Sequence, residues 1–195
     1  MHYVVIGGSA AGINAVEAIR SIDREGYITL ISDETHTLYS RCLITYYLSG
    51  TISEEKLKYR PDDFYTKNKV NTILGVKAEK VIAGEKKVKL SDGQVISFDK
   101  LLIATGASPK MLNIPGVNKK GVFGIRTIRD IFAIKEILSQ VKTVVILGGG
   151  LIGLRSAYAL NACGKETKVV VKSNRILSQM LDEGAAGLIQ KKIEE

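Results

Sequence analysis

The chain of 195 residues is 45% hydrophobic and 25% charged, a composition typical of a globular protein with room for one large or two small hydrophobic cores. Its two cysteines, Cys42 and Cys163, lie far apart and form no CxxC pair, which argues against a disulfide scaffold and against a metal site of zinc or iron–sulfur type. Of the net charge of +8, residues 101–195 carry +7, with 14 basic and 7 acidic side chains. This excess favours phosphorylated ligands or an acidic electron-transfer partner, or it reflects only a basic solvated surface.

Other function classes find no support. Basic and aromatic residues do not interleave in the way that nucleic-acid binding favours. The chain enters a strand at once, without the succession of basic, apolar and cleavage-site regions that marks a signal peptide. No apolar run approaches the length of a membrane span. We therefore expect a cytoplasmic protein that binds neither nucleic acid nor membrane.

The first informative segment is VVIGGSAAG at residues 4–12, in which an apolar strand leads through a glycine-rich turn into a helix expected over residues 10–19. Gly7 and Gly12 occupy the outer positions of the dinucleotide fingerprint GxGxxG, and Ser9 replaces the middle glycine. The helix would aim free N–H groups and the positive end of its dipole at a phosphate. Small residues that merely allow close packing of strand and helix are the alternative.

A second strand is expected at residues 27–31, and Asp33 and Glu34 follow it. A carboxylate about 20 or more residues beyond the glycine turn is where an adenosine ribose finds its partner. Farther on, Arg60-Pro61 opens a short helix, since proline suits a first turn. Short alternating runs over residues 76–98 predict an antiparallel meander.

Residues 101–104 are apolar throughout and predict a buried parallel strand, followed by a linker at residues 107–116 with two prolines. The second glycine turn, VVILGGGLIG at residues 144–153, fills all three fingerprint positions with Gly148, Gly150 and Gly153. A helix is expected over residues 151–162. Two such turns in one chain indicate two dinucleotides held close together, as in enzymes that use flavin and nicotinamide.

The strand expected after this turn, at residues 167–171, is followed by Lys172 and Arg175 and by no acid. The two cations suit the 2′-phosphate of NADP, although basic residues after a strand also form ordinary solvated faces. A last helix begins near residue 181. The predicted fold class is α/β, with two Rossmann-like nucleotide-binding units, the first carrying a small antiparallel β-meander and the second apparently truncated.

The chain resembles the FAD- and NAD(P)-dependent pyridine nucleotide-disulfide oxidoreductase superfamily. The likeness rests on both glycine turns and on LYSRCLITYYLSG at residues 38–50, DKLLIATGASP at 99–109 and GIRTIRD at 124–130. It is greatest to the branch with rubredoxin and ferredoxin reductases, NADH oxidases and the flavoprotein part of nitrite reductase. It implies an FAD-binding domain over residues 1–112 and an incomplete NAD(P)-binding domain over residues 113–195.

The resemblance also implies the residues that contact the two cofactors. For FAD these are Gly7, Ser9, Ala11, Gly12 and Asp33, with Arg41, Ala78, Ala104, Thr105, Gly106 and Arg126 beside the flavin or adenine. For NAD(P)H they are Gly148, Gly150, Leu151, Ile152 and Gly153. Simple packing would also account for Ala104, and an exposed cation for Arg126.

Three residues depart from the family pattern. Tyr46 stands where related reductases carry a flavin-facing lysine, Arg155 where many have glutamate, and Val171 where an NAD-selecting glutamate is usual. Family members also continue beyond the second nucleotide-binding unit with segments that complete the FAD site and an interface domain. We therefore expect this chain to be part of a longer flavoenzyme or to associate with further copies.

The resemblance implies an FAD-dependent NAD(P)H oxidoreductase that passes electrons to a small redox protein or a small-molecule acceptor. A non-catalytic dinucleotide-binding fragment that needs a missing C-terminal part is the alternative. Cys42 is a candidate catalytic thiol, because some members carry a redox cysteine in the corresponding helix and the neighbouring Arg41 favours a thiolate. The alternative is an inert cysteine, since YSRCL also resembles the branch with YxRP, in which no thiol acts.

Overall fold

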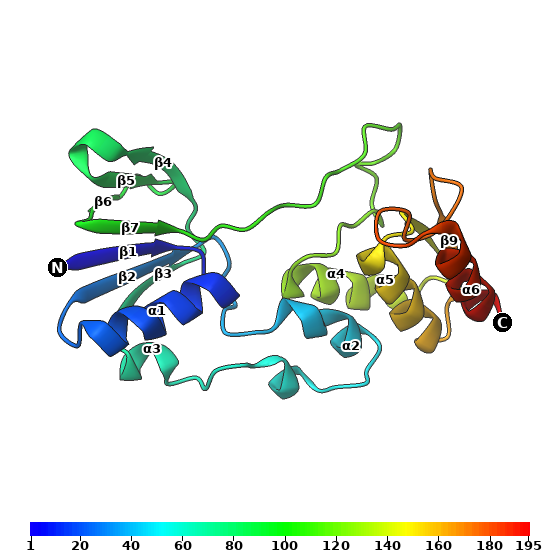
Figure 1. Ribbon diagram of the computed structural model, residues 1–195, viewed down its shortest axis with the longest axis horizontal. Helices are drawn as coiled ribbons and strands as arrows, with labels where there is room; N and C mark the ends of the chain where they lie inside the picture. The colour runs from blue at the N-terminus through cyan, green and yellow to red at the C-terminus, as the bar shows by residue number, and fades with distance from the viewer. The chain divides into compact units, whose positions relative to one another are not determined.

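The computed structural model describes residues 1–195, and the chain divides into two compact units (Figure 1). The first unit comprises Met1–Ser40 and Glu55–Ser108, and the second comprises Arg41–Glu54 and Pro109–Glu195. The segment Arg41–Glu54 thus packs with the second unit, although the residues on either side of it belong to the first.

The first unit is built on a four-stranded parallel sheet, and α1 (Ala10–Ile22) connects its first two strands. The strand order is β3 (Val70–Leu74), β2 (Tyr27–Ser32), β1 (His2–Ile6) and β7 (Lys100–Ile103). The order reverses between β1 and β7, since β2 and β3 extend the sheet on one side of β1 and β7 pairs on the other. In doubly wound sheets this switch point creates the crevice in which ligands bind.

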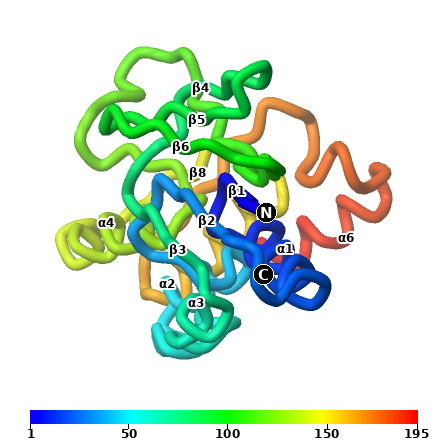
Figure 2. Tube along the Cα trace, turned by 90° about the vertical axis from the view of Figure 1, so that its left-hand side faces the viewer, coloured from blue at the N-terminus to red at the C-terminus, as the bar shows by residue number.

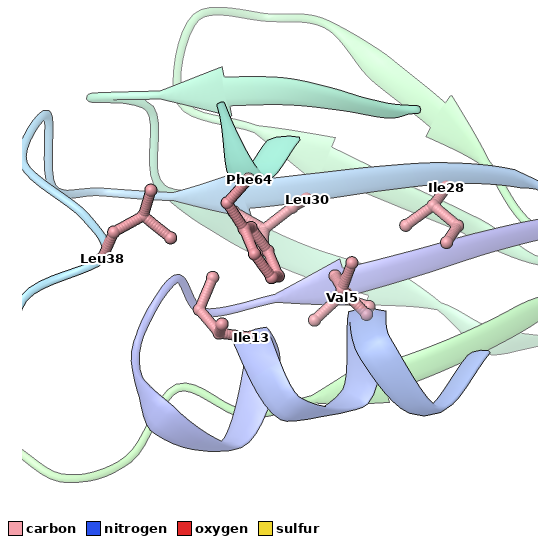
Figure 3. Packing of buried hydrophobic residues seen from close by; sticks show 7 residues of the cluster. Val5, Ile13, Ile28, Leu30, Leu38 and Phe64 are labelled. Carbon is pink, nitrogen blue, oxygen red and sulfur yellow. The ribbon is translucent and has the colours of Figure 1, made fainter. Parts of the chain in front are cut away.

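Alternation along the central strands produces two hydrophobic cores, one on each face of the sheet. Val5 and Leu30 pack with Ile13 of α1 and with Phe64, as Figure 3 shows. Val4, Ile6 and Ile31 face the other way and pack against Val88 and Leu90. The sheet is therefore covered on both faces, as buried parallel strands require.

The second face is covered by the predicted antiparallel meander. Its strands are β4 (Ala78–Ile82), β5 (Lys87–Leu90) and β6 (Val95–Ser97), with the 3₁₀ turn η3 (Ala83–Glu85) between the first two. Figure 2 shows the meander on the side of the sheet opposite α1 and α3 (Phe64–Lys67). The α3 helix begins three residues after Pro61, whose carbonyl accepts a hydrogen bond of 3.1 Å from the Phe64 amide, so the proline lies before the helix and not in its first turn as predicted.

The strand after the meander, β7, differs from its prediction in burial. Its apolar run predicts a buried strand, but the side chains of Leu102 and Ile103 are 40% and 61% exposed. The reason is position: β7 pairs only with β1 and forms an edge of the sheet. An apolar run by itself does not distinguish a central strand from an edge strand.

The second unit contains a two-stranded parallel sheet, and its elements follow the predicted order. They are η1 (Arg41–Leu43), α2 (Ile44–Leu48), η2 (Glu54–Leu57), which begins in this unit, α4 (Ile128–Leu138), β8 (Thr143–Leu147), α5 (Leu151–Ala162), β9 (Glu166–Val170) and α6 (Glu183–Glu194). The α5 helix joins β8 to the parallel strand β9 in a βαβ unit of the type that binds dinucleotides. The predicted α/β class with two Rossmann-like units is confirmed.

The contacts of α2 explain why Arg41–Glu54 belongs to the second unit. The Arg155 guanidinium of α5 lies 4.2 Å from the centre of the Tyr46 ring, and the Lys135 ammonium of α4 lies 4.1 Å from that of Tyr47. The Cys163 thiol donates a hydrogen bond of 3.3 Å to the Leu48 carbonyl. These cation–π and hydrogen-bond contacts hold α2 against α4 and α5.

None of the helices combines the length and the apolar character needed to span a lipid bilayer.

Candidate functional site

The two glycine turns share one backbone geometry. Gly7 has φ of 121° and Gly148 has φ of 120°, a backbone conformation that residues other than glycine rarely adopt. The Gly7 amide donates a hydrogen bond of 2.8 Å to the carbonyl of Ile31 in β2, and the Gly148 amide does the same to Val170 in β9. Two segments far apart in the sequence thus form the same strand-to-helix turn, as the repeated fingerprint predicts.

The last glycine of each fingerprint is required by packing. A Cβ atom on Gly12 would lie 1.9 Å from the Gly7 carbonyl oxygen, and one on Gly153 would lie 2.1 Å from that of Gly148. No side chain fits at such distances, because the first turn of each helix passes directly over the turn. Close packing therefore explains these two glycines by itself.

Packing does not explain Gly150. Its φ of −79° and ψ of 177° are open to any residue, and a Cβ atom there would have no neighbour within 4 Å. The open space lies at the N-cap of α5, where no side chain caps the helix and no acidic residue occupies the first turn. The oxygens of a phosphate at this place would accept hydrogen bonds from the backbone N–H groups of the helix N-terminus. The second turn therefore fits a dinucleotide pyrophosphate.

In the first unit the switch point brings predicted site residues together. A Cβ atom on Gly7 would lie 2.2 Å from the Ala104 carbonyl oxygen and 3.3 Å from the Thr105 nitrogen. The end of β7 therefore crosses the glycine turn, and Gly106 turns the chain away with φ of 68°. Ser9 is the N-cap of α1, and its side chain makes no capping bond to the helix. Ala11, in the first turn of α1, is exposed.

The two acids after β2 have different surroundings. The Glu34 carboxylate accepts a hydrogen bond of 2.5 Å from the hydroxyl of the buried Tyr39. Asp33 is exposed, and its carboxylate makes no hydrogen bond within the protein. The structure therefore leaves the Asp33 carboxylate accessible to a ribose, whereas Glu34 already supports the loop that follows.

Ala78, expected beside the adenine, is the first residue of β4 and pairs with Leu90 of the meander. Two residues earlier, the Val76 amide donates a hydrogen bond of 3.1 Å to the carbonyl of Ser32, directly before Asp33. The segment leading to Ala78 is thus tied to the end of β2. Ala78 itself packs against the core cluster that contains Ile6, the residue before Gly7.

Arg41, Cys42 and Arg126 lie in the second unit. The Arg41 guanidinium donates a hydrogen bond of 3.2 Å to the Arg126 carbonyl. The Arg126 amide donates in turn to the carboxylate of Asp130, which belongs to the capping box of α4. Cys42 is exposed and carries a free thiol in η1. The side chain of the candidate thiol is therefore accessible.

A cavity of about 670 Å³ opens beside the second glycine turn. Its lining comes from the turn and from the loop that follows β9: Gly148, Gly149, Gly150, Leu151, Val171, Lys172, Ser173, Leu177, Ser178, Gln179 and Met180. Lys172 is the one charged side chain among these residues, and no carboxylate lines the cavity. This concave, positively charged site suits an anionic nucleotide.

The cavity lining can be compared with the residues that the sequence predicted. Residues 177–180 line it, but sequence analysis missed them because a loop without periodic pattern carries no signal of its position. Of the two predicted cations, Lys172 lines the cavity and Arg175 does not. The Arg175 guanidinium instead donates to the carbonyls of Leu181 and Ser178 at 3.4 and 3.3 Å.

The chain thus contains two Rossmann-like units, each with a positive-φ glycine at the strand end and a helix without a side-chain cap behind it, which is the architecture of dinucleotide-binding domains. The family model described as pyridine nucleotide-disulphide oxidoreductase matches residues 1–195. The chain belongs to this family.

Relatives and solved structures agree with this membership. The chain is 33% identical to the NADH-dependent phenylglyoxylate dehydrogenase subunit epsilon of Aromatoleum evansii, over 97% of this chain and 45% of the relative. It is 32% identical to the rubredoxin-NAD(+) reductase of Pseudomonas putida, over 100% of this chain and 51% of the relative. The structure of an NAD-dependent persulfide reductase from A. fulgidus superposes with a TM-score of 0.94 at 30% identity, over 100% of this chain and 38% of the other. The chain spans about half the length of these proteins or less.

Proposed function

We propose that the chain forms the dinucleotide-binding part of an FAD-dependent NAD(P)H oxidoreductase. FAD would bind the first unit at the Gly7 turn, and the nicotinamide nucleotide would bind the second unit at the Gly148 turn. The observation that carries the proposal is the repetition of one turn geometry, together with the open space at Gly150. The names of the relatives support it, since they describe NAD(P)H-dependent reductases and oxidases.

The residues of this chain would bind and orient the cofactors. The N-terminal turns of α1 and α5 present N–H groups to the two pyrophosphates, and Asp33 accepts from the adenosine ribose of FAD. Ala104, Thr105 and Gly106 border the FAD site at the switch point. Bound FAD would supply the redox chemistry, accepting hydride from the nicotinamide and passing electrons onward.

For the electron acceptor we propose a chemical class and no particular molecule. Relatives are named for rubredoxin, nitrite, sulfur and persulfide, so small redox proteins and small molecules are both represented. The excess of positive charge in residues 101–195 favours an acidic protein acceptor. We place the protein in the cytoplasm.

Anaerobic mixing of the purified protein with NADPH or NADH tests the proposal. The protein should copurify with a yellow flavin, and the flavin absorbance should bleach on addition of the nucleotide. A colourless protein that takes up no added FAD would refute the enzyme. A protein that binds both nucleotides without bleaching would favour the alternative, a binding unit without turnover of its own.

For the nicotinamide nucleotide we expect no strong preference for NADH, so that NADPH binds at least as tightly. Val171 directly follows β9, at the place where an acid would repel a 2′-phosphate, and Lys172 lines the cavity. Titration of the protein with both nucleotides should give a dissociation constant for NADPH equal to or lower than that for NADH. Clearly tighter binding of NADH would contradict this expectation.

Replacing Asp33 by alanine should weaken FAD binding by about 1.5–3 kcal/mol, the value of a hydrogen bond to a charged group. Glu34→Gln is the matched control, because the amide oxygen still accepts from the Tyr39 hydroxyl and the loop keeps its support. Fluorescence titration with FAD measures both variants. Equal FAD affinity in Asp33→Ala and the wild-type protein would assign the ribose to another residue, with Glu34 the next to test.

Cys42→Ser should retain most of the NAD(P)H-dependent flavin reduction. The side chain is exposed, and hydride transfer to flavin needs no thiol. Stopped-flow absorbance measures the reduction, and Cys163→Ser is the matched control for loss of a thiol. Loss of disulfide or peroxide turnover in Cys42→Ser alone, or a sulfenic acid found on Cys42 by mass spectrometry, would establish a redox role.

A further inference from the structure

The loop after β9 is attached to the second glycine turn. The Leu177 amide donates a hydrogen bond of 2.8 Å to the Gly149 carbonyl, and Ile176 beside it is buried. A Cβ atom on Gly149 would lie 2.2 Å from Cγ1 of Val171, so the two segments are in close contact. Leu177 has φ of 50°, in the left-handed region that a residue with a Cβ atom adopts only at an energetic cost. Surrounding contacts must therefore hold the loop in this shape.

Arg175 supplies contacts of this kind. Its Nε and Nη2 atoms donate to the carbonyls of Leu181 and Ser178, which closes residues 175–181 into a compact turn. Behind it, the Ser173 hydroxyl donates a hydrogen bond of 2.7 Å to the Arg175 carbonyl. A guanidinium suits such a site because its donors form a rigid fork. The side chain is half-buried within the loop and is not part of the cavity lining.

We infer that Arg175 is a positioning residue, which braces the loop so that Lys172, Ser178 and Gln179 meet the adenosine end of the nicotinamide nucleotide. This inference rests on the proposed function. It replaces the sequence-based expectation that Arg175 itself binds the 2′-phosphate.

The polar side chains of the cavity support this division of roles. Lys172, Ser178 and Gln179 line it, and their side chains make no hydrogen bonds within the protein, so their donors are open to a ligand. The hydroxyl hydrogen of Ser173 is used within the loop, although Ser173 also lines the cavity. Lys172 would contribute charge to the 2′-phosphate, and Ser178 and Gln179 would contribute hydrogen bonds to phosphate or ribose.

The first test follows the loop itself in the protein without nucleotide. Amide hydrogen exchange of Leu177 and Leu181 should accelerate at least about tenfold in Arg175→Ala and in Arg175→Lys, because neither side chain restores the two-pronged contact. Arg129→Ala, which removes an exposed arginine from α4, is the matched control and should leave these amides unchanged. Unchanged exchange in both Arg175 variants would overturn the inference.

The second test measures NADPH affinity and distinguishes a brace from a ligand. Arg175→Ala and Arg175→Lys should both weaken NADPH binding about tenfold, and Lys172→Ala should do so by a similar factor. In the double variant of Arg175→Ala and Lys172→Ala, the Lys172 substitution should lower NADPH affinity by less than about a further twofold. Without Arg175 the loop no longer holds the Lys172 side chain in position to bind the nucleotide. Retention of wild-type NADPH affinity in Arg175→Lys would overturn the inference. A lysine can still bind a phosphate directly, but it cannot make the two hydrogen bonds of the guanidinium to the loop carbonyls. The inference would also be overturned if the double variant lost NADPH affinity by the product of the factors measured for the two single variants.

The two experiments separate this inference from the proposed function. If the wild-type protein binds neither NADPH nor NADH, the proposed function fails and the role in nucleotide recognition fails with it, while amide exchange still shows whether Arg175 holds the loop. If the wild-type protein binds nucleotide and only the Arg175 results disagree, the inference alone is wrong. Far-UV circular dichroism and thermal unfolding verify that each variant is folded.

Discussion

Replacing Gly12 by alanine is expected to abolish measurable FAD binding. The new methyl group would lie 1.9 Å from the Gly7 carbonyl oxygen, and the obstacle is backbone, which no rotamer change relieves. Either α1 moves away from β1 or the Gly7 turn opens, and both changes withdraw the helix N–H groups from the pyrophosphate. We expect FAD affinity to fall by at least about 100-fold, or ~2.7 kcal/mol, measured by absorbance or fluorescence titration.

The equivalent substitution in the second unit, Gly153→Ala, is the matched control. It introduces the same clash, 2.1 Å from the Gly148 carbonyl oxygen, and should weaken nicotinamide nucleotide binding while leaving FAD on the first unit. Both variants should also unfold at lower temperature, since overpacking of a close contact typically costs about 1–3 kcal/mol. Wild-type FAD affinity in Gly12→Ala would show that FAD does not bind at this turn.

The second large effect is expected for Gly150→Ala, which should lose nucleotide binding without losing stability. The backbone of Gly150 is in an ordinary extended conformation, and the added methyl group meets no protein atom within 4 Å. The midpoint of thermal unfolding should therefore stay within about a degree of the wild-type value, as for substitutions away from packed features. The methyl group would occupy the space through which a pyrophosphate reaches the α5 amides, so we expect NADPH and NADH affinity to fall about 100-fold.

The contrast between Gly150→Ala and Gly153→Ala makes this prediction specific. Gly153→Ala should lower stability and nucleotide affinity together, whereas Gly150→Ala should lower affinity alone. Isothermal titration calorimetry and thermal unfolding measure the two quantities independently. Unchanged nucleotide affinity in Gly150→Ala would mean that the open space beside α5 is not the pyrophosphate site.

The sequence by itself predicted those features that depend on residues close together in the chain. The glycine turns at Gly7 and Gly148 need positive φ, and the helices behind them need a residue without Cβ at Gly12 and Gly153. These requirements act over a few residues, so a short pattern expresses them. The period-two alternation of the meander is equally local. The α/β class, the two nucleotide-binding units and the bounds of α5 followed from such patterns.

Only the tertiary structure decided which segments lie together. Arg41–Glu54 packs with the second unit because Tyr46 and Tyr47 meet cations from α5 and α4, more than 80 residues farther along the chain. The exposure of β7 followed from its place at the edge of the sheet. Sequence proximity to a strand end made Arg175 a candidate phosphate ligand, but its donors are directed to backbone carbonyls of its own loop. Long polar side chains have several partners within reach, and the folded backbone determines which of them is used.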